Sequence, residues 1–109
     1  MSAITTHVLD TSRGRPAGGV AVRLERGPEV LAHGATDADG RLRDLLPAGT
    51  PLQPGSYRLV FDTGAYFAGH AADAFYPEVS VVFQVRDAGE HYHVPLLLSP
   101  FGYSTYRGS

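Results

Sequence analysis

Short segments in which every second residue is apolar recur along this chain, with glycine or proline between them. In the clearest case, residues 79–86 read Val-Ser-Val-Val-Phe-Gln-Val-Arg, so every odd-numbered position is apolar. A period of two residues is that of a β-strand that buries one face. Many short strands separated by turn residues predict an all-β fold, an antiparallel β-sandwich of seven to eight strands. The expected strands include residues 4–10, 20–25, 57–62, 79–86, 92–98 and 103–107.

One segment departs from this alternation. Residues 63–74 are rich in alanine and predict one short helix before Pro77, with Gly64 and Gly69 limiting its length. Residues 37–40 read Asp-Ala-Asp-Gly, which predicts a tight turn because Asp and Gly tolerate left-handed backbone angles. The 109 residues, 43% of them hydrophobic, suffice for one packed core, so we expect residues 1–109 to form a single domain.

Composition excludes several kinds of site. The chain has no cysteine and no lysine, which rules out thiolate nucleophiles, thiolate zinc sites and lysine Schiff bases. A formal net charge of −2 gives no electrostatic signal for nucleic acid or an anionic membrane. The start of the chain, residues 1–7, lacks the basic and apolar parts of a secretory signal. We expect a cytoplasmic protein with no nucleic-acid or membrane partner.

Histidines are the side chains best suited to proton transfer near neutral pH. In residues 91–98 the even positions are apolar, so His91 and His93 should project together from the other face of that strand. His7 shares a strand face with Thr5, and a metal site made of His7, His91 and His93 is one alternative. Solvated surface histidines are the other alternative, which we also expect for His33 in a loop and His70 in the helix.

The C-terminal residues 99–109 stay aromatic and β-prone to the last position, whereas chain ends are usually polar and frayed. Tyrosine and arginine dominate binding hot spots, so this end is expected to dock into an interface or a pocket. A plain edge strand is the alternative.

Several motifs together carry a resemblance to one family. They are residues 6–11 with Gly14 and Pro16, residues 36–41, residues 75–79, and the block 91–109, which closes on Tyr-Arg-Gly-Ser. With these motifs the chain resembles the transthyretin-related 5-hydroxyisourate hydrolases over nearly its whole length. The resemblance implies a transthyretin-like sandwich that assembles as a homotetramer, a dimer of dimers with its sites at the interfaces. It also implies hydrolysis of 5-hydroxyisourate to 2-oxo-4-hydroxy-4-carboxy-5-ureidoimidazoline, in the degradation of urate to allantoin.

The resemblance also implies a set of functional residues. Two histidines would serve as base and acid for the attack of water, in an order that the sequence leaves open. Arginine would bind the urate-like anion and stabilise negative charge, and the terminal carboxylate could orient a histidine. No cofactor and no metal is needed for such a step. The implied catalytic residues are His7, Arg41, His93 and Ser109, and the implied substrate-binding residues are His7, Arg41, Tyr106 and Arg107.

Two other classes of protein share such a sandwich. A non-catalytic transthyretin-like carrier of a small aromatic ligand would not need two titratable groups facing an arginine, together with the Tyr-Arg-Gly-Ser ending. An immunoglobulin-like adhesion module would be expected to carry a secretory signal. The combination of His7, Arg41, His93 and the C-terminal tetrapeptide therefore favours the hydrolase.

Overall fold

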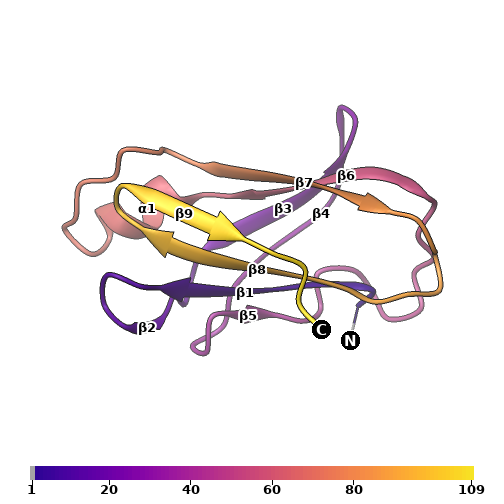
Figure 1. Cartoon of the computed structure of the whole chain (residues 1–109), viewed down its shortest axis with the longest axis horizontal. Coiled ribbons are helices and arrows are strands. Elements are labelled where there is room, and N and C mark those ends of the chain that lie inside the picture. The colour runs from indigo at the N-terminus through magenta and orange to yellow at the C-terminus, as the bar shows by residue number, and fades with distance from the viewer. Residues whose placement is uncertain (1) are drawn as a thin grey trace.

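The protein, described for residues 2–109 by a computed structural model, is built from two β-sheets with one short helix at an end (Figure 1). The first sheet contains β2 (Arg15–Pro16), β1 (Ile4–Asp10), β8 (Tyr92–Ser99) and β9 (Gly102–Thr105) in that order, and β5 (Arg41–Leu42) also pairs with β1. The second sheet contains β4 (Glu29–Ala35), β3 (Ala21–Arg26), β6 (Gly55–Phe61) and β7 (Val79–Val85). Helix α1 spans Thr63–Ala68. The predicted all-β sandwich with one short helix is confirmed.

The centre of the first sheet is a parallel pair. Strands β1 and β8 run in the same direction, with Ile4 opposite Tyr92 and Asp10 opposite Leu98. Every other pairing of the named strands is antiparallel. Parallel neighbours need a crossover, and here the crossover is the entire second sheet. The two strands that carry the candidate histidines are therefore neighbours in the sheet although most of the chain lies between them in the sequence.

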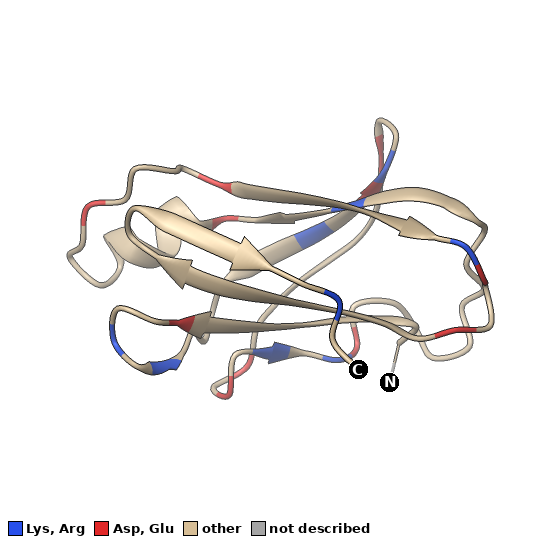
Figure 2. Ribbon diagram, viewed as in Figure 1, with Lys and Arg blue, Asp and Glu red and all other residues tan. Residues whose placement is uncertain are grey.

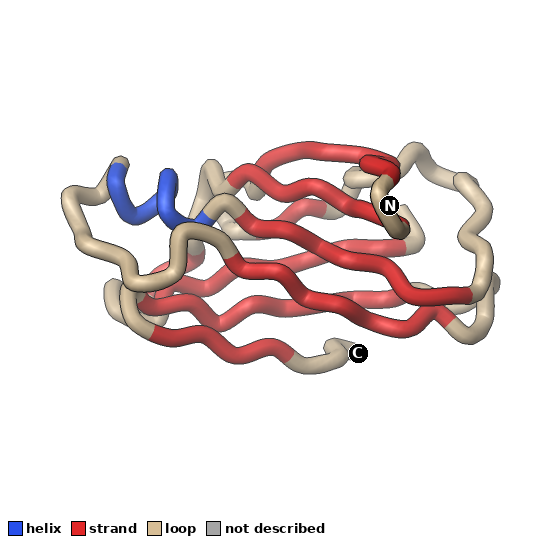
Figure 3. Tube along the Cα trace, turned by 90° about the horizontal axis from the view of Figure 1, so that it is seen from above, coloured by secondary structure: helices blue, strands red, loops and turns tan. Residues whose placement is uncertain are grey.

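The core confirms the predicted alternation. All four even-numbered residues of β8 from Tyr92 to Leu98 are buried, and so are Leu24 of β3 and Phe61 of β6, at the centre of the second sheet. The strands of both sheets run along the long axis of the molecule, with α1 at one end (Figure 3). Since alternate residues point to opposite faces, burial of these side chains turns the odd-numbered residues of β8 away from the core.

Two predicted elements end at least two residues earlier in the structure than expected. The helix ends at Ala68, where Gly69 caps it, so His70 follows the helix instead of lying in it. Strand β9 ends at Thr105, so Tyr106 and Arg107 continue without the strand pairing expected for them.

Strand β4 was not predicted from the sequence. This strand lies at the edge of its sheet, and its residues are exposed or half-buried with no clean alternation, because only part of one face meets the core. His33 belongs to β4, opposite Arg23, and not to a loop as predicted. No helix within residues 2–109 is long and apolar enough to cross a membrane.

Candidate active site

Strand register brings the candidate residues of the first sheet together. Thr5 lies opposite His93 in the parallel pair, and His7 lies opposite Arg41 in the antiparallel pair of β1 and β5. Because opposite residues share a face, Thr5, His7, Arg41 and His93 are neighbours on the face turned away from the core. A hollow of about 150 Å³ opens there, and its lining consists of Thr5, Thr6, Arg41, Arg43, His91, His93 and Ser109.

His93 is held by its neighbours in a defined orientation. Its Nδ1 lies 2.8 Å from the hydroxyl of Thr5, and its ring stacks on that of His91 at 6.3 Å between centroids. Within residues 2–109 no hydrogen bond uses its Nε2. The side chain is half-buried, so one ring nitrogen is anchored and the other is available to a reacting molecule.

The surroundings of His93 favour its neutral form. Burial lowers the pKa of this imidazole below its ordinary value. The nearby groups His91, His7 and Arg41 lower it further by charge repulsion, while a hydrogen bond with the backbone of Thr5 acts in the opposite direction. A histidine that stays neutral near pH 7 can accept a proton, which is what a general base must do.

The tight turn at residues 37–40 places Arg41. The Asp37 carboxylate accepts hydrogen bonds from the backbone N–H groups of Asp39 and Arg41, both at 2.9 Å, and these bonds hold the pKa of Asp37 below its ordinary value. Gly40 has φ of +76°, and a Cβ there would lie 2.3 Å from the carbonyl oxygen of Val8. The predicted Asp-Ala-Asp-Gly turn is confirmed, and its glycine is required both by the backbone angle and by close packing.

The same turn also fixes His7. The Nε2 of His7 lies 2.9 Å from the carbonyl oxygen of Asp39, which can only accept, so this nitrogen carries the proton. The Nδ1 is left for other partners. The guanidinium of Arg41, by contrast, makes no hydrogen bond or ion pair with any residue from 2 to 109, so its donors remain available.

The C-terminus folds back onto His93. The N–H of Gly108 donates to the carbonyl oxygen of His93 at 2.9 Å, forming an isolated bridge. A Cβ on Gly108 would lie 2.5 Å from Cδ2 of His93, so only glycine allows this close approach. Ser109 thereby reaches the hollow, and the sequence-based expectation of a docked C-terminus fits this arrangement.

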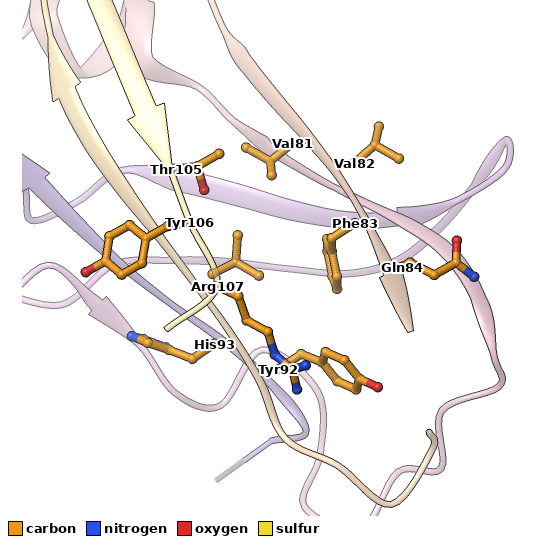
Figure 4. A pocket seen from close by; sticks show the side chains of 10 residues that line it. Val81, Val82, Phe83, Gln84, Tyr92, His93, Thr105, Tyr106 and Arg107 are labelled. Carbon is orange, nitrogen blue, oxygen red and sulfur yellow. The ribbon is translucent and has the colours of Figure 1, made fainter. Parts of the chain in front are cut away.

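Neither Tyr106 nor Arg107 lines the hollow: the ring of Tyr106 lies beside that of His93 on the same side, whereas Arg107 points to the opposite side (Figure 4). With His93 they line a second pocket of about 300 Å³ between β7, β8 and the terminal segment (Figure 4). The guanidinium of Arg107 reaches across to cover the ring of Tyr92 at 4.7 Å and donates to Glu90 at 3.1 Å. Within one chain, therefore, the structure brings together Arg41, His93 and Ser109 with His7 beside them. Tyr106 lies next to His93 without lining the hollow, and Arg107 is separated from that group.

Four residues of the hollow were not among the predicted site residues: Thr5, Thr6, Arg43 and His91. Alternation was the available signal for Thr5, Arg43 and His91, since each lies two positions from a predicted residue. Figure 2 shows no charged residue along β8 or β9, so the positive charge of the hollow comes from the β5 region. Across the described residues, no three His, Asp or Glu side chains group closely enough to hold a metal ion. The imidazole of His7 is instead hydrogen-bonded to the backbone carbonyl oxygen of Asp39.

Comparisons with known proteins agree on one family. Residues 4–108 match the model of the HIUase/Transthyretin family. The 5-hydroxyisourate hydrolase of Caulobacter vibrioides is 49% identical over 117 residues, covering 100% of both chains. The structure of Klebsiella pneumoniae 5-hydroxyisourate hydrolase superimposes with a TM-score of 0.89 at 41% identity, covering 100% of this chain and 94% of that one. Sea bream transthyretin in complex with thyroxine gives a TM-score of 0.88 at 34% identity, covering 97% and 94%.

Proposed function

The chain belongs to the HIUase/Transthyretin family, and we propose that the hollow on its β1, β5 and β8 face is where it hydrolyses 5-hydroxyisourate. The protein is a hydrolase of urate degradation, and its product is 2-oxo-4-hydroxy-4-carboxy-5-ureidoimidazoline. Similarity favours this activity over a carrier role, since the hydrolase of Caulobacter is 49% identical and the thyroxine-bound transthyretin 34%. The residues that carry the reaction are proposed below.

The observation that carries the proposal is a half-buried histidine, favoured in its neutral form, beside an unpaired arginine. Hydrolysis of an acyl–nitrogen bond needs a base for water, donors for the developing oxyanion and a proton for the departing nitrogen. His93 Nε2 takes a proton as water attacks the acyl carbon. Arg41 stabilises the negative charge on the carbonyl oxygen, because its guanidinium stays charged and has free donors. Arg43 adds positive charge at the same hollow.

His7 completes the step as the acid. Its Nε2 is engaged by the carbonyl of Asp39, so its Nδ1, once protonated, delivers a proton to the nitrogen as the carbon–nitrogen bond breaks. Ser109 contributes its hydroxyl and the terminal carboxylate, which lies near two histidines and can orient the imidazolium that forms. None of these steps calls for a cofactor or a metal.

We also propose that the protein works as a homotetramer, a dimer of dimers. Among residues 2–109, edge strands β7 and β9 have no partner on their outer sides, and Val82 and Tyr103 on them are 60% and 44% exposed. The hollow is open on a single chain, and Tyr106, 56% exposed, lies outside it. A second subunit would cover the hollow and would bring its own Tyr106 and Arg107, which the family resemblance implies as substrate-binding residues, to the site. A cytoplasmic location is part of the same proposal, and cell fractionation tests it.

The proposal is tested by following freshly prepared 5-hydroxyisourate by ultraviolet absorbance. The wild-type protein should accelerate its decay, and Arg41→Gln should lower kcat by about 10²- to 10³-fold, as loss of one oxyanion donor does. Arg86→Gln is the matched control, because Arg86 is exposed and lies outside the hollow. A wild-type protein without activity would overturn the function. Wild-type rates in Arg41→Gln would overturn the site.

A further inference from the structure

The hydroxyl of Thr5 lies between two imidazole rings. Its Oγ1 is 2.9 Å from Nε2 of His91 and 2.8 Å from Nδ1 of His93, and the residue is 4% exposed. The two rings are stacked with 19° between their planes. A hydroxyl has a single proton to give, so Thr5 can donate to one ring only while it accepts from the other.

This constraint couples the tautomers of the two histidines. If Thr5 donates to His91, then His93 must donate from Nδ1, and its Nε2 carries a free electron pair. If Thr5 donates to His93, then Nδ1 of that ring is the acceptor and its Nε2 carries the proton. The direction of one hydroxyl therefore decides whether His93 faces the hollow as a base or as an acid.

We propose that Thr5 is a positioning residue that keeps the proton of His93 on Nδ1 and relays a proton from His93 to His91 during the reaction. This inference deepens the proposed function and rests on it, because the base assigned to His93 needs a free Nε2. His91 suits the far end of the relay because its side chain is exposed, so water can solvate a charge that the half-buried His93 cannot hold as well.

The relay balances without any further reactant. Water loses a proton to Nε2 of His93 as its oxygen bonds to the acyl carbon. The Nδ1 proton of His93 then moves to Oγ1 of Thr5, while the hydroxyl proton of Thr5 moves to Nε2 of His91. The pair has gained one proton and one positive charge, which now sits on His91. The reverse shift restores both rings when His93 loses its Nε2 proton.

The test compares variants that keep or remove the hydroxyl. Thr5→Val removes it with little change of shape, and we expect kcat to fall at least about 10-fold with KM within a few-fold, since proton-transfer groups act on the chemical step. Thr5→Ser restores the hydroxyl and should restore most of kcat. Thr63→Val is the matched control, because Thr63 is a buried threonine at the helix, outside the hollow.

A structural role for Thr5 would be distinguished by the pH dependence of kcat. Besides the hydroxyl of Thr5, the groups that face His93 are the backbone of Thr5, His91 immediately before β8, His7 on β1, Arg41 and Arg43 from the β5 region, and Ser109 with its terminal carboxylate. Thr5→Val leaves all of them in place, yet it should move the acid limb of the profile to lower pH. The reason is that the imidazolium of His93 loses an acceptor for its Nδ1 proton.

His91→Asn removes the far end of the relay, and combining it with Thr5→Val should cost no more than Thr5→Val alone. Additive losses in the double variant would overturn the relay. Equal damage from Thr5→Ser and Thr5→Val would overturn the role of the hydroxyl, as would a wild-type kcat and pH profile in Thr5→Val.

Nitrogen-15 NMR of the histidine rings tests the inference without substrate. The neutral His93 should carry its proton on Nδ1 in the wild type and in Thr5→Ser, and Thr5→Val should shift the ring toward the Nε2–H form. A wild-type His93 protonated on Nε2 would overturn the assignment even if the protein hydrolyses 5-hydroxyisourate. An inactive wild type with the Nδ1–H form would overturn the proposed function and leave the tautomer assignment standing.

Discussion

The two ends of β1 both bury polar groups, but they differ in how much hydrogen-bonding capacity is already used. At its C-terminal end Asp10, 1% exposed, accepts from the N–H and hydroxyl of Ser12, from the N–H of Arg13 and from the hydroxyl of Tyr66. Both carboxylate oxygens are occupied, and the cluster ties the strand to helix α1.

At the other end of β1, His93 keeps a free Nε2 and Arg41 a free guanidinium within the described residues. Burial of a polar group costs free energy, which hydrogen bonds to neighbours offset. In the Asp10 cluster both carboxylate oxygens accept hydrogen bonds from neighbouring groups, and these bonds stabilise the fold. The hollow leaves some of its groups without partners, and these groups are the ones that can act on a substrate.

The largest effect should come from the histidines of the hollow. His93→Asn or His7→Asn should lower kcat by roughly 10²- to 10⁴-fold, the range for general acid–base groups, while circular dichroism stays unchanged. If both variants hydrolysed 5-hydroxyisourate at wild-type rates, the two-histidine mechanism would be wrong.

Removal of Tyr106 to Ser109 should also damage catalysis more than folding. The truncation takes away the contact between Gly108 and His93 and relocates the terminal carboxylate, and a displacement of about 1 Å at a reacting centre can cost about 10²-fold. Size-exclusion chromatography must accompany the kinetics, because loss of assembly would remove activity for another reason. A truncated protein that keeps the assembly state of the wild type and its activity within a few-fold would show that this segment is only an extension of the edge strand.

The C-terminal end of β1 should show the reverse, a loss of stability with little loss of activity. Asp10→Asn removes one acceptor from a buried cluster and should lower the free energy of unfolding by about 1–3 kcal/mol, with kcat near the wild-type value. Denaturant titration and the same absorbance assay check the two quantities. A large loss of kcat in a stably folded Asp10→Asn variant would contradict the assignment of a purely structural role to the C-terminal end of β1.

The same variant has a pH signature. Burial raises the pKa of Asp10, but its bonds with Ser12, Tyr66 and Arg13 outweigh burial, so the pKa lies below its ordinary value of 3.8. A carboxylate with a lowered pKa stabilises the fold above its unfolded pKa, and this contribution is lost as the pH falls through the folded pKa. Acid should therefore destabilise the wild type more than Asp10→Asn in the range below about pH 4.

Sequence reasoning predicted the parts of the fold that depend on local patterns. Strand β7 alternates clearly, the even-numbered positions of β8 are all apolar, and the turn at residues 37–40 has the chemistry that such turns require. Strand β4 has no such pattern because it lies at an edge, and β5 has only two residues, too few to show a period. The end of α1 at Gly69 depends on packing that composition alone does not fix.

The site was harder to predict for a different reason. Alternation alone placed His91 and His93 on one face, but their meeting with Arg41 depends on the parallel register of β1 and β8, a long-range property. That grouping came from the resemblance to a family. Thr5 was placed on the face of His7 but given no role, because a threonine in a strand has no distinctive signal until its two ring partners are seen.

The pH dependence of kcat/KM tests most directly whether neutral His93 takes the proton from water. Because burial and nearby charges lower its pKa, the acid limb should fall at a pH below the ordinary histidine value of 6.5, with the rate rising as His93 loses its proton. His93→Asn should remove that limb along with most of the activity. A limb that stays at the same pH in His93→Asn, or a wild-type limb above 6.5, would contradict the account.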